Sequence, residues 1–191
     1  MSATEFMMEQ VKQYPGQIMI LCIGPATNVA LACQADETFA ENTAGIIYMG
    51  GNMGNESSFN WSYDADAVKV CLESAFPKQM ICTSEIVEFM KIPPRFLKEL
   101  ATFENSEVAQ FFVDRSGIAG ANKKLWDVVI PAVLLCPELV VTSVEDSVAV
   151  SVEEDTYGLM SFAENGTKAT VVSEVKGPDV YALMQELFRE K

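Results

Sequence analysis

Three short apolar runs set the strongest limit on the fold of this chain. They are QIMILCIG at 17–24, GIIYMGG at 45–51 and KQMICTS at 78–84. Continuous apolar runs of this length that end at turn-forming residues are typical of strands buried on both faces. Helical patterns separate them, so strand and helix alternate every 20–30 residues. This alternation predicts an α/β domain with a Rossmann-like, mainly parallel sheet flanked by helices.

The rest of the chain adds helices and a second group of strands. Helices are predicted at residues 3–13, 25–33, 64–74, twice within 93–115, at 126–136 and after 178, with Asp64 as the N-cap of 64–74. Pro131 is expected to kink the helix at 126–136. The alternating pattern of 138–175 predicts strands that form an edge or a small sheet. The length of 191 residues predicts one domain over 1–191.

Ligands of parallel sheets gather beyond the carboxyl ends of the strands. Two of the predicted strands end in polar or glycine-rich turns, GPATN at 24–28 and MGGN at 49–52. We therefore expect a binding site where these two turns meet.

Composition excludes several kinds of chemistry and partner. The chain has no histidine, which rules out a Ser–His–Asp triad, a Cys–His pair and histidine-ligated zinc. A net charge of −14 argues against nucleic acid and anionic membranes as partners. Five scattered cysteines without a CxxC motif predict buried free thiols rather than disulfides or zinc ligands. With no signal sequence and no membrane-length apolar run, a cytoplasmic location is expected.

Four segments together resemble one family. IGPATNVALA (23–32) is similar to the "GPLTNIALA" segment of the inosine/uridine-type nucleoside hydrolases, and IIYMGG (46–51) to their "VVLMGG". SSFNWSYDADAVKV (57–70) resembles "AEFNxxxDPEAAxxV", and LWDVVIPAVLLCPELV (125–140) resembles their late helix. The resemblance implies cleavage of the N-glycosidic bond of nucleosides. It also implies one calcium ion and a calcium-bound water that an aspartate activates.

The resemblance assigns two positions to the metal. Thr27 matches the residue whose backbone carbonyl binds calcium, and Asp127 matches a late calcium-binding aspartate. From the residues alone, Thr27 is an N-cap of the next helix, a role compatible with the first because its hydroxyl and carbonyl are separate groups. From the residues alone, Asp127 is an acid at a helix N-terminus.

Four further positions match substrate contacts. Met49 corresponds to a residue that lines the ribose pocket, and Asn55 and Asn60 to amides that bind ribose hydroxyls. Trp126 stands where most relatives have histidine. The purine-preferring branch has tryptophan there, and an indole can stack on a purine, so purine nucleosides are the expected ligands. The alternatives are core packing for Met49 and Trp126, and turn chemistry for the two asparagines.

Two departures from the family pattern count against activity. Ser58 falls where the family has a carboxylate, and the first aspartate is Asp36, without the "DxDxxxDD" cluster that supplies calcium ligands and the general base. Calcium needs six to eight oxygen ligands, so we expect no tight calcium binding by this chain alone. The expectation is a truncated or degenerate nucleoside hydrolase that is weakly active or inactive.

Two alternatives remain open. One is a working hydrolase whose missing strand is supplied elsewhere. The other is a non-catalytic module that binds a ribosyl ligand or a protein partner. Loss of the first strands of the family would expose a sheet edge, so we expect self-association, as a homodimer, or poor solubility.

Overall fold

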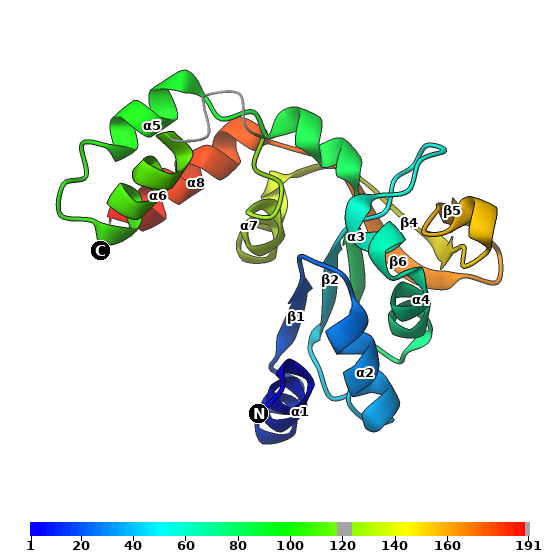
Figure 1. The fold of residues 1–191 in the computed structure, drawn as a ribbon. Helices are drawn as coiled ribbons and strands as arrows, with labels where there is room; N and C mark the ends of the chain where they lie inside the picture. Colours follow the sequence, from blue (N-terminus) through cyan, green and yellow to red (C-terminus); the bar gives the residue numbers. More distant parts are fainter. Residues whose placement is uncertain (118–123, 190–191) are drawn as a thin grey trace. The chain divides into compact units, whose positions relative to one another are not determined.

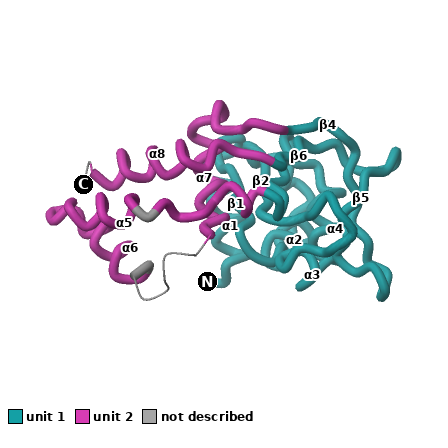
Figure 2. Tube along the Cα trace, turned by 90° about the horizontal axis from the view of Figure 1, so that it is seen from above, with its two compact units in different colours: residues 1–85, 143–173 teal, residues 86–142, 174–191 magenta. Residues whose placement is uncertain are grey.

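The computed structural model describes residues 1–117 and 124–189, and these group into two compact units (Figure 2). Unit 1 contains residues 1–85 and 143–173, and unit 2 contains residues 86–142 and 174–191. The division passes within two strands, β4 (Val140–Val150) and β6 (Thr167–Val175). The prediction of a single domain over 1–191 stays a prediction.

The described strands, drawn as arrows in Figure 1, form a six-stranded sheet in the order β1-β2-β3-β6-β4-β5. The other strands are β1 (Met19–Cys22), β2 (Gly45–Met49), β3 (Gln79–Cys82) and β5 (Met160–Phe162). β1, β2, β3 and β6 pair in parallel, and β4 pairs with β5 in antiparallel orientation. The predicted mainly parallel α/β sheet is confirmed.

The position of the late strands differs in part from the sequence expectation. β4 and β5 lie at one edge, as predicted. β6, however, lies inside the main sheet and pairs with β3, with Ile81 opposite Val171. Buried and partly exposed residues are mixed along β6, so its apolar residues do not form a continuous run. A sequence of this kind is typical of an edge strand, although β6 lies in the interior of the sheet.

Helices flank the strands of unit 1. They are α1 (Ala3–Gln13), α2 (Thr27–Ala35), α3 (Phe59–Tyr63), α4 (Ala65–Glu73) and a 3₁₀ turn at Glu154–Thr156. The prediction for Asp64 is confirmed, because its carboxylate caps α4 by accepting a hydrogen bond from the Ala67 N–H at 3.0 Å. α3 was not predicted, since five residues are too few to show a helical period.

β2 is the most deeply buried strand of unit 1, with every residue buried. On one of its faces Tyr48 meets Trp61 edge to face, with ring centroids 6.3 Å apart. The Tyr48 hydroxyl donates a hydrogen bond to the Gln79 side chain at 3.0 Å, so its polar end is satisfied inside the core.

Unit 2 is mainly helical. Its elements are α5 (Pro94–Leu100), α6 (Glu107–Gly117), α7 (Val129–Leu135), α8 (Gly177–Arg189), a 3₁₀ turn at Pro137–Leu139 and most of the 3₁₀ helix Ser84–Phe89. Phe96 packs edge to face on Tyr181, whose hydroxyl donates to the Met90 carbonyl at 2.8 Å. Burial raises the pKa of Tyr181 to about 12.

α7 corrects the sequence analysis at its start. The helix begins at Val129 rather than at residue 126, so Trp126 and Asp127 lie in the turn that precedes it. Pro131 is then in the first helical turn, where a missing N–H leaves no helical bond unmade. The predicted kink therefore has no structural cause.

All five cysteines are free, as predicted, with three buried and two half-buried. A hydrogen bond with Cys71 on α4 lowers the pKa of Cys33 on α2 below its ordinary value. The same contact, together with burial, raises the pKa of Cys71. Among the described residues, no helix is long and apolar enough to cross a membrane.

Candidate functional site

The carboxyl ends of β1, β2 and β3 form the edge of the unit 1 sheet where the sequence predicts a site. These strands end at Cys22, Met49 and Cys82. The loop after β2, residues 50–58, crosses this edge before α3 begins. We call these strand ends and this loop the unit 1 edge.

Two glycines shape the chain as it leaves β2. A Cβ atom on Gly50 would lie 2.3 Å from the indole ring of Trp61, so only glycine lets the backbone pass this buried ring. Gly51 has a φ of +75°, a backbone conformation that favours glycine. The MGG motif is therefore explained by the packing of Trp61 beneath the loop.

Asn60 connects the ends of two strands. Its side-chain NH₂ group donates to the Met49 carbonyl at 2.9 Å and to the Ile23 carbonyl at 3.4 Å. Because carbonyl oxygens accept only, these partners fix the orientation of the amide. Within the described residues both bonds use the donor end, which leaves the side-chain oxygen as an acceptor at the edge.

Ser58 is buried and has a structural bond of its own. Its hydroxyl oxygen accepts a hydrogen bond from the Gly51 N–H at 2.8 Å. The serine thus holds the loop after β2, and its own hydroxyl hydrogen remains a possible donor. Ser58 supplies no carboxylate at this position.

Thr27 lies at the start of α2 but is not its N-cap. The N-cap is Ala26, and the Thr27 hydroxyl donates instead to the carboxylate of Asp64. This bond links the first turn of α2 to the residue that caps α4. The hydroxyl is therefore engaged, while the backbone carbonyl assigned to calcium is a separate group.

The structure brings together some of the predicted residues of unit 1. Met49, buried, and Asn60 share a hydrogen bond, and Ser58 holds the loop between them. Asn55 lies in the exposed part of the same loop, outside this network.

Sequence reasoning missed two residues of the unit 1 edge, Ser84 and Glu85. The Ser84 hydroxyl accepts from the Asn52 side chain at 2.9 Å and donates to the Gly51 carbonyl at 3.1 Å. Glu85 Oε1 accepts from the Met53 N–H at 2.8 Å. The only sequence signal was their place directly after β3, at the end of the "ICTSE" segment.

Trp126 and Asp127 belong to unit 2. The Trp126 side chain is 42% exposed, which excludes a simple core role. Asp127 does not cap α7, and its Oδ1 is a buried oxygen without a hydrogen-bond partner among the described residues. Burial raises the pKa of the Asp127 carboxyl above its ordinary value.

The donor set does not fit a complete calcium site. The unpartnered oxygen of Asp127 suits a cation, but residues 1–117 and 124–189 contain no cluster of three or more His, Cys, Asp or Glu side chains that could hold one. Calcium takes six to eight oxygen ligands. We therefore derive no step through a metal ion.

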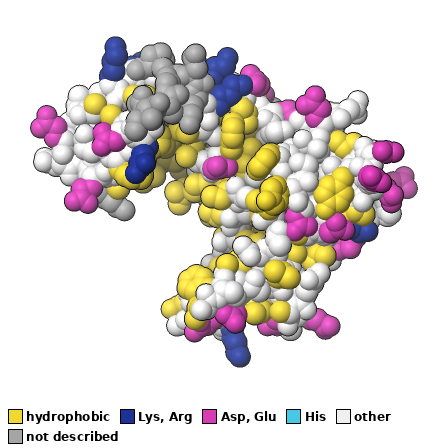
Figure 3. Space-filling view, viewed as in Figure 1, with side chains coloured by type: hydrophobic (Ala, Val, Ile, Leu, Met, Phe, Trp, Pro, Cys, Tyr) yellow, Lys and Arg dark blue, Asp and Glu magenta, His cyan; other side chains and the backbone are white. Residues whose placement is uncertain are grey.

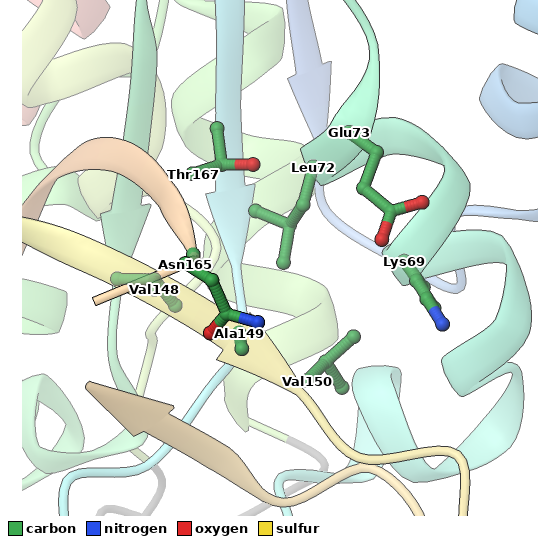
Figure 4. A pocket seen from close by; sticks show the side chains of 9 residues that line it. Lys69, Leu72, Glu73, Val148, Ala149, Val150, Asn165 and Thr167 are labelled. Atoms are coloured by element: carbon green, nitrogen blue, oxygen red, sulfur yellow. The ribbon is translucent and has the colours of Figure 1, made fainter. Parts of the chain in front are cut away.

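Unit 1 also contains a cavity of about 200 Å³ (Figure 4). Its walls come from α4, the end of β4 and the start of β6, and they carry Lys69, Glu73, Asn165 and Thr167 around the apolar Leu72. None of the residues predicted for a site lines it. Over the face in Figure 3, acidic side chains are spread widely, in keeping with the net charge of −14.

Comparison with known proteins identifies the relatives of this chain. The profile of the family described as "Inosine-uridine preferring nucleoside hydrolase" matches residues 1–182. An uncharacterized protein of Schizosaccharomyces pombe is 23% identical over an alignment 218 residues long, which covers 98% of this chain and 56% of that protein. Uridine nucleosidase 1 of Arabidopsis thaliana is 46% identical over 57 residues, which cover 28% of this chain and 17% of that protein.

Solved structures show the same fold. The inosine-uridine preferring nucleoside hydrolase from Bacillus anthracis has a TM-score of 0.90 at 17% identity, over 100% of this chain and 66% of that one. The purine-preferring ribonucleoside hydrolase from Gardnerella vaginalis has a TM-score of 0.83 at 21% identity, over 100% of this chain and 67% of that one. The chain thus spans about half the length of the Schizosaccharomyces pombe protein and about two thirds of the length of these two solved chains.

Proposed function

The chain belongs to the inosine-uridine preferring nucleoside hydrolase family, and from this premise we propose that its unit 1 edge binds the ribosyl group of a nucleoside. A sugar hydroxyl both donates and accepts, so it needs fixed partners of both kinds. The observation that carries the proposal is Asn60, whose donors are held by the ends of β1 and β2 while its acceptor is left at the edge.

The reaction of the family sets a further requirement on the site. Hydrolysis of a glycosidic bond passes through an oxocarbenium-like transition state and needs a positioned base to activate water. The residues of the unit 1 edge supply amides, hydroxyls and the carboxylate of Glu85, which is engaged with Met53. We therefore propose that this chain binds nucleosides but hydrolyses them at a rate about 10²-fold or more below that of a site with a positioned base.

Trp126 supports a preference for purine nucleosides. Its indole is partly exposed and so is available to stack on a base. A purine offers a larger face for stacking than a pyrimidine. The relatives include both uridine nucleosidases and a purine-preferring hydrolase, so the preference is a proposal about this chain's own residue.

Calorimetric titrations of inosine and uridine into the chain, in the presence of a chelator, test this function. We expect inosine to bind more tightly than uridine. Trp126→Ala should reduce this difference, and Trp126→Phe should keep much of it because the ring is retained. Equal binding of both nucleosides by the original chain would reject the purine preference, and no binding of either would reject the function.

A second function is favoured by one observation. Within the described residues β1 pairs only with β2, and Leu21 and Ile23 at its end are 37% and 49% exposed. An open strand of this kind can pair with a second chain. We propose on this basis that the protein forms a homodimer, as a ribosyl-binding or protein-interaction module without catalysis.

A further inference from the structure

Glu85 is the carboxylate most closely tied to the unit 1 edge. It follows β3 by three positions and belongs to the segment that holds the loop after β2. Ser84 donates to the Gly51 carbonyl through its N–H at 3.0 Å and through its hydroxyl at 3.1 Å. Glu85 Oε1 holds the next part of the loop through the Met53 N–H at 2.8 Å. The loop is therefore fixed to the end of β3 by side chains as well as by backbone.

The second carboxylate oxygen of Glu85, Oε2, does not take part in holding the loop. Oε2 is a buried atom without a hydrogen-bond partner among the described residues. A buried acceptor that lacks a donor loses its hydration without compensation, and native structures rarely keep one without a reason. Oε2 is thus an acceptor prepared for a donor that the described residues do not provide.

The chemistry around Oε2 selects the kind of donor. A metal ion would need further anionic ligands, and no suitable cluster of His, Cys, Asp or Glu occurs in the described part of the chain. A hydroxyl needs only one acceptor and brings no charge. The Ser58 hydroxyl on the same loop and the Asn60 amide on α3, which binds the end of β2, are also partners for hydroxyls.

The loop that Glu85 holds has an exposed middle part. Residues 53–57 are exposed, whereas Gly51 and Ser58 on either side are buried and held. Glu85 Oε1 accepts from Met53 at the start of this exposed part, so the carboxylate is bound to a segment that solvent reaches. Because Oε2 is buried, a ligand donor that binds it forms the hydrogen bond away from bulk water, where such a bond is stronger.

We propose that Glu85 is the carboxylate of a sugar-hydroxyl subsite. Oε1 fixes the Met53 amide, and Oε2 accepts a hydrogen bond from a hydroxyl of the ribosyl ligand. Ser58, where the family pattern has a carboxylate, has none to offer and is engaged with the Gly51 backbone, so we assign the role to Glu85. The identity of the ligand rests on the proposed function, while the free acceptor does not.

The test combines variants of the full chain with ligands that lack single hydroxyls. Inosine, 2′-deoxyinosine and 3′-deoxyinosine are titrated by calorimetry into the original chain, Glu85→Gln and Glu56→Gln. Glu56 lies exposed in the same loop, so Glu56→Gln makes the same charge change as a matched control. Amide NMR spectra of each variant show whether the fold is kept.

A hydrogen bond to a charged acceptor predicts a clear pattern. Glu85→Gln should weaken inosine binding by about 10-fold or more, and Glu56→Gln should leave it unchanged. One deoxy analogue should bind the original chain and Glu85→Gln with similar affinity, because the hydroxyl that Glu85 recognises is already missing. A purely structural role would weaken all three ligands alike.

The outcomes separate the two proposals. Suppose that the original chain binds inosine, and that Glu85→Gln either binds each of the three ligands as tightly as the original chain does or binds all three more weakly by the same factor. The subsite is then rejected and the proposed function stands. If the original chain binds none of the ligands, the proposed function is rejected, and the subsite with it. If Glu85→Gln does not fold, Glu85→Asp replaces it, with the same selective loss for one hydroxyl expected.

Discussion

The side-chain amide of Asn60 donates a hydrogen bond to the backbone carbonyl of Met49 across 2.9 Å, and a longer one to the carbonyl of Ile23. Met49 is the last residue of β2, and Ile23 follows the last residue of β1. One side chain therefore links the two strand ends, and within the described residues its own oxygen is left as an acceptor. The ribosyl proposal depends on this arrangement.

Replacement of Asn60 tests how much its two hydrogen bonds contribute to the stability of the fold. Asn60→Ala leaves two backbone carbonyls without this donor, so the free energy of unfolding should fall by about 1–3 kcal/mol. Urea unfolding followed by circular dichroism measures this change. Asn55→Ala, in the exposed part of the loop, is the control and should change stability by less than about 0.5 kcal/mol. Equal effects of the two variants would show that the Asn60 bonds are not important for stability.

Gly50 should tolerate no side chain. The added Cβ of Gly50→Ala would lie 2.3 Å from the Trp61 ring, a clash that requires the buried indole or the strand to move. We expect a loss of about 1–3 kcal/mol, seen as a lower thermal midpoint. Gly24→Ala is the matched control, because nothing lies within 4 Å of its Cβ. A midpoint unchanged by Gly50→Ala would contradict the packing of Trp61 against this loop.

Cys33 should react as a thiolate at lower pH than an ordinary thiol. The hydrogen bond with Cys71 lowers the pKa of Cys33. As the pH rises, Cys33 therefore loses its proton and becomes a reactive thiolate below the usual thiol pKa of about 8.5. Alkylation with iodoacetamide, mapped by mass spectrometry over a pH series, measures this. Cys71→Ala should move the Cys33 profile to higher pH, and Cys71→Ser should move it less. An identical profile in Cys71→Ala would show that Cys71 does not act on Cys33.

The open side of β1 predicts self-association. Light scattering should give the mass of a dimer, because β1 pairs only with β2 within the described residues and Leu21 is partly exposed on it. Leu21→Lys should shift the protein toward the monomer. Leu31→Lys, at an exposed position of α2, should leave the dimer intact. A monomer for the unaltered chain over the accessible concentration range would reject the proposed dimer.

The elements that could be predicted from sequence are those whose signals are local. The strand runs ending at Cys22, Met49 and Cys82 stand out by continuous apolar composition, and Asp64 by its place before a helical pattern. The start of α7 was placed too early, because WDVVIPAVLLC is apolar apart from Asp127, and Asp127 resembled an acid of the first helical turn although it does not cap α7. Its true start at Val129 places Trp126 in a turn.

The missed part of the site has a different cause. Ser84 and Glu85 act on residues 51–53, more than thirty positions earlier in the chain. Such a contact exists only because β2 and β3 are neighbours in the sheet and their following loops meet. Neither residue belongs to one of the four segments that resemble the family. Ser58 was noticed as a departure, but its bond to Gly51 required the folded loop.

The most direct test of the account is one experiment on inosine with the purified chain. Calcium binding is measured by calorimetry, and release of hypoxanthine is followed in the same buffer. We expect inosine to bind, calcium not to bind tightly, and hypoxanthine to appear slowly or to stay undetected. Tight calcium binding together with rapid release of hypoxanthine would contradict this expectation.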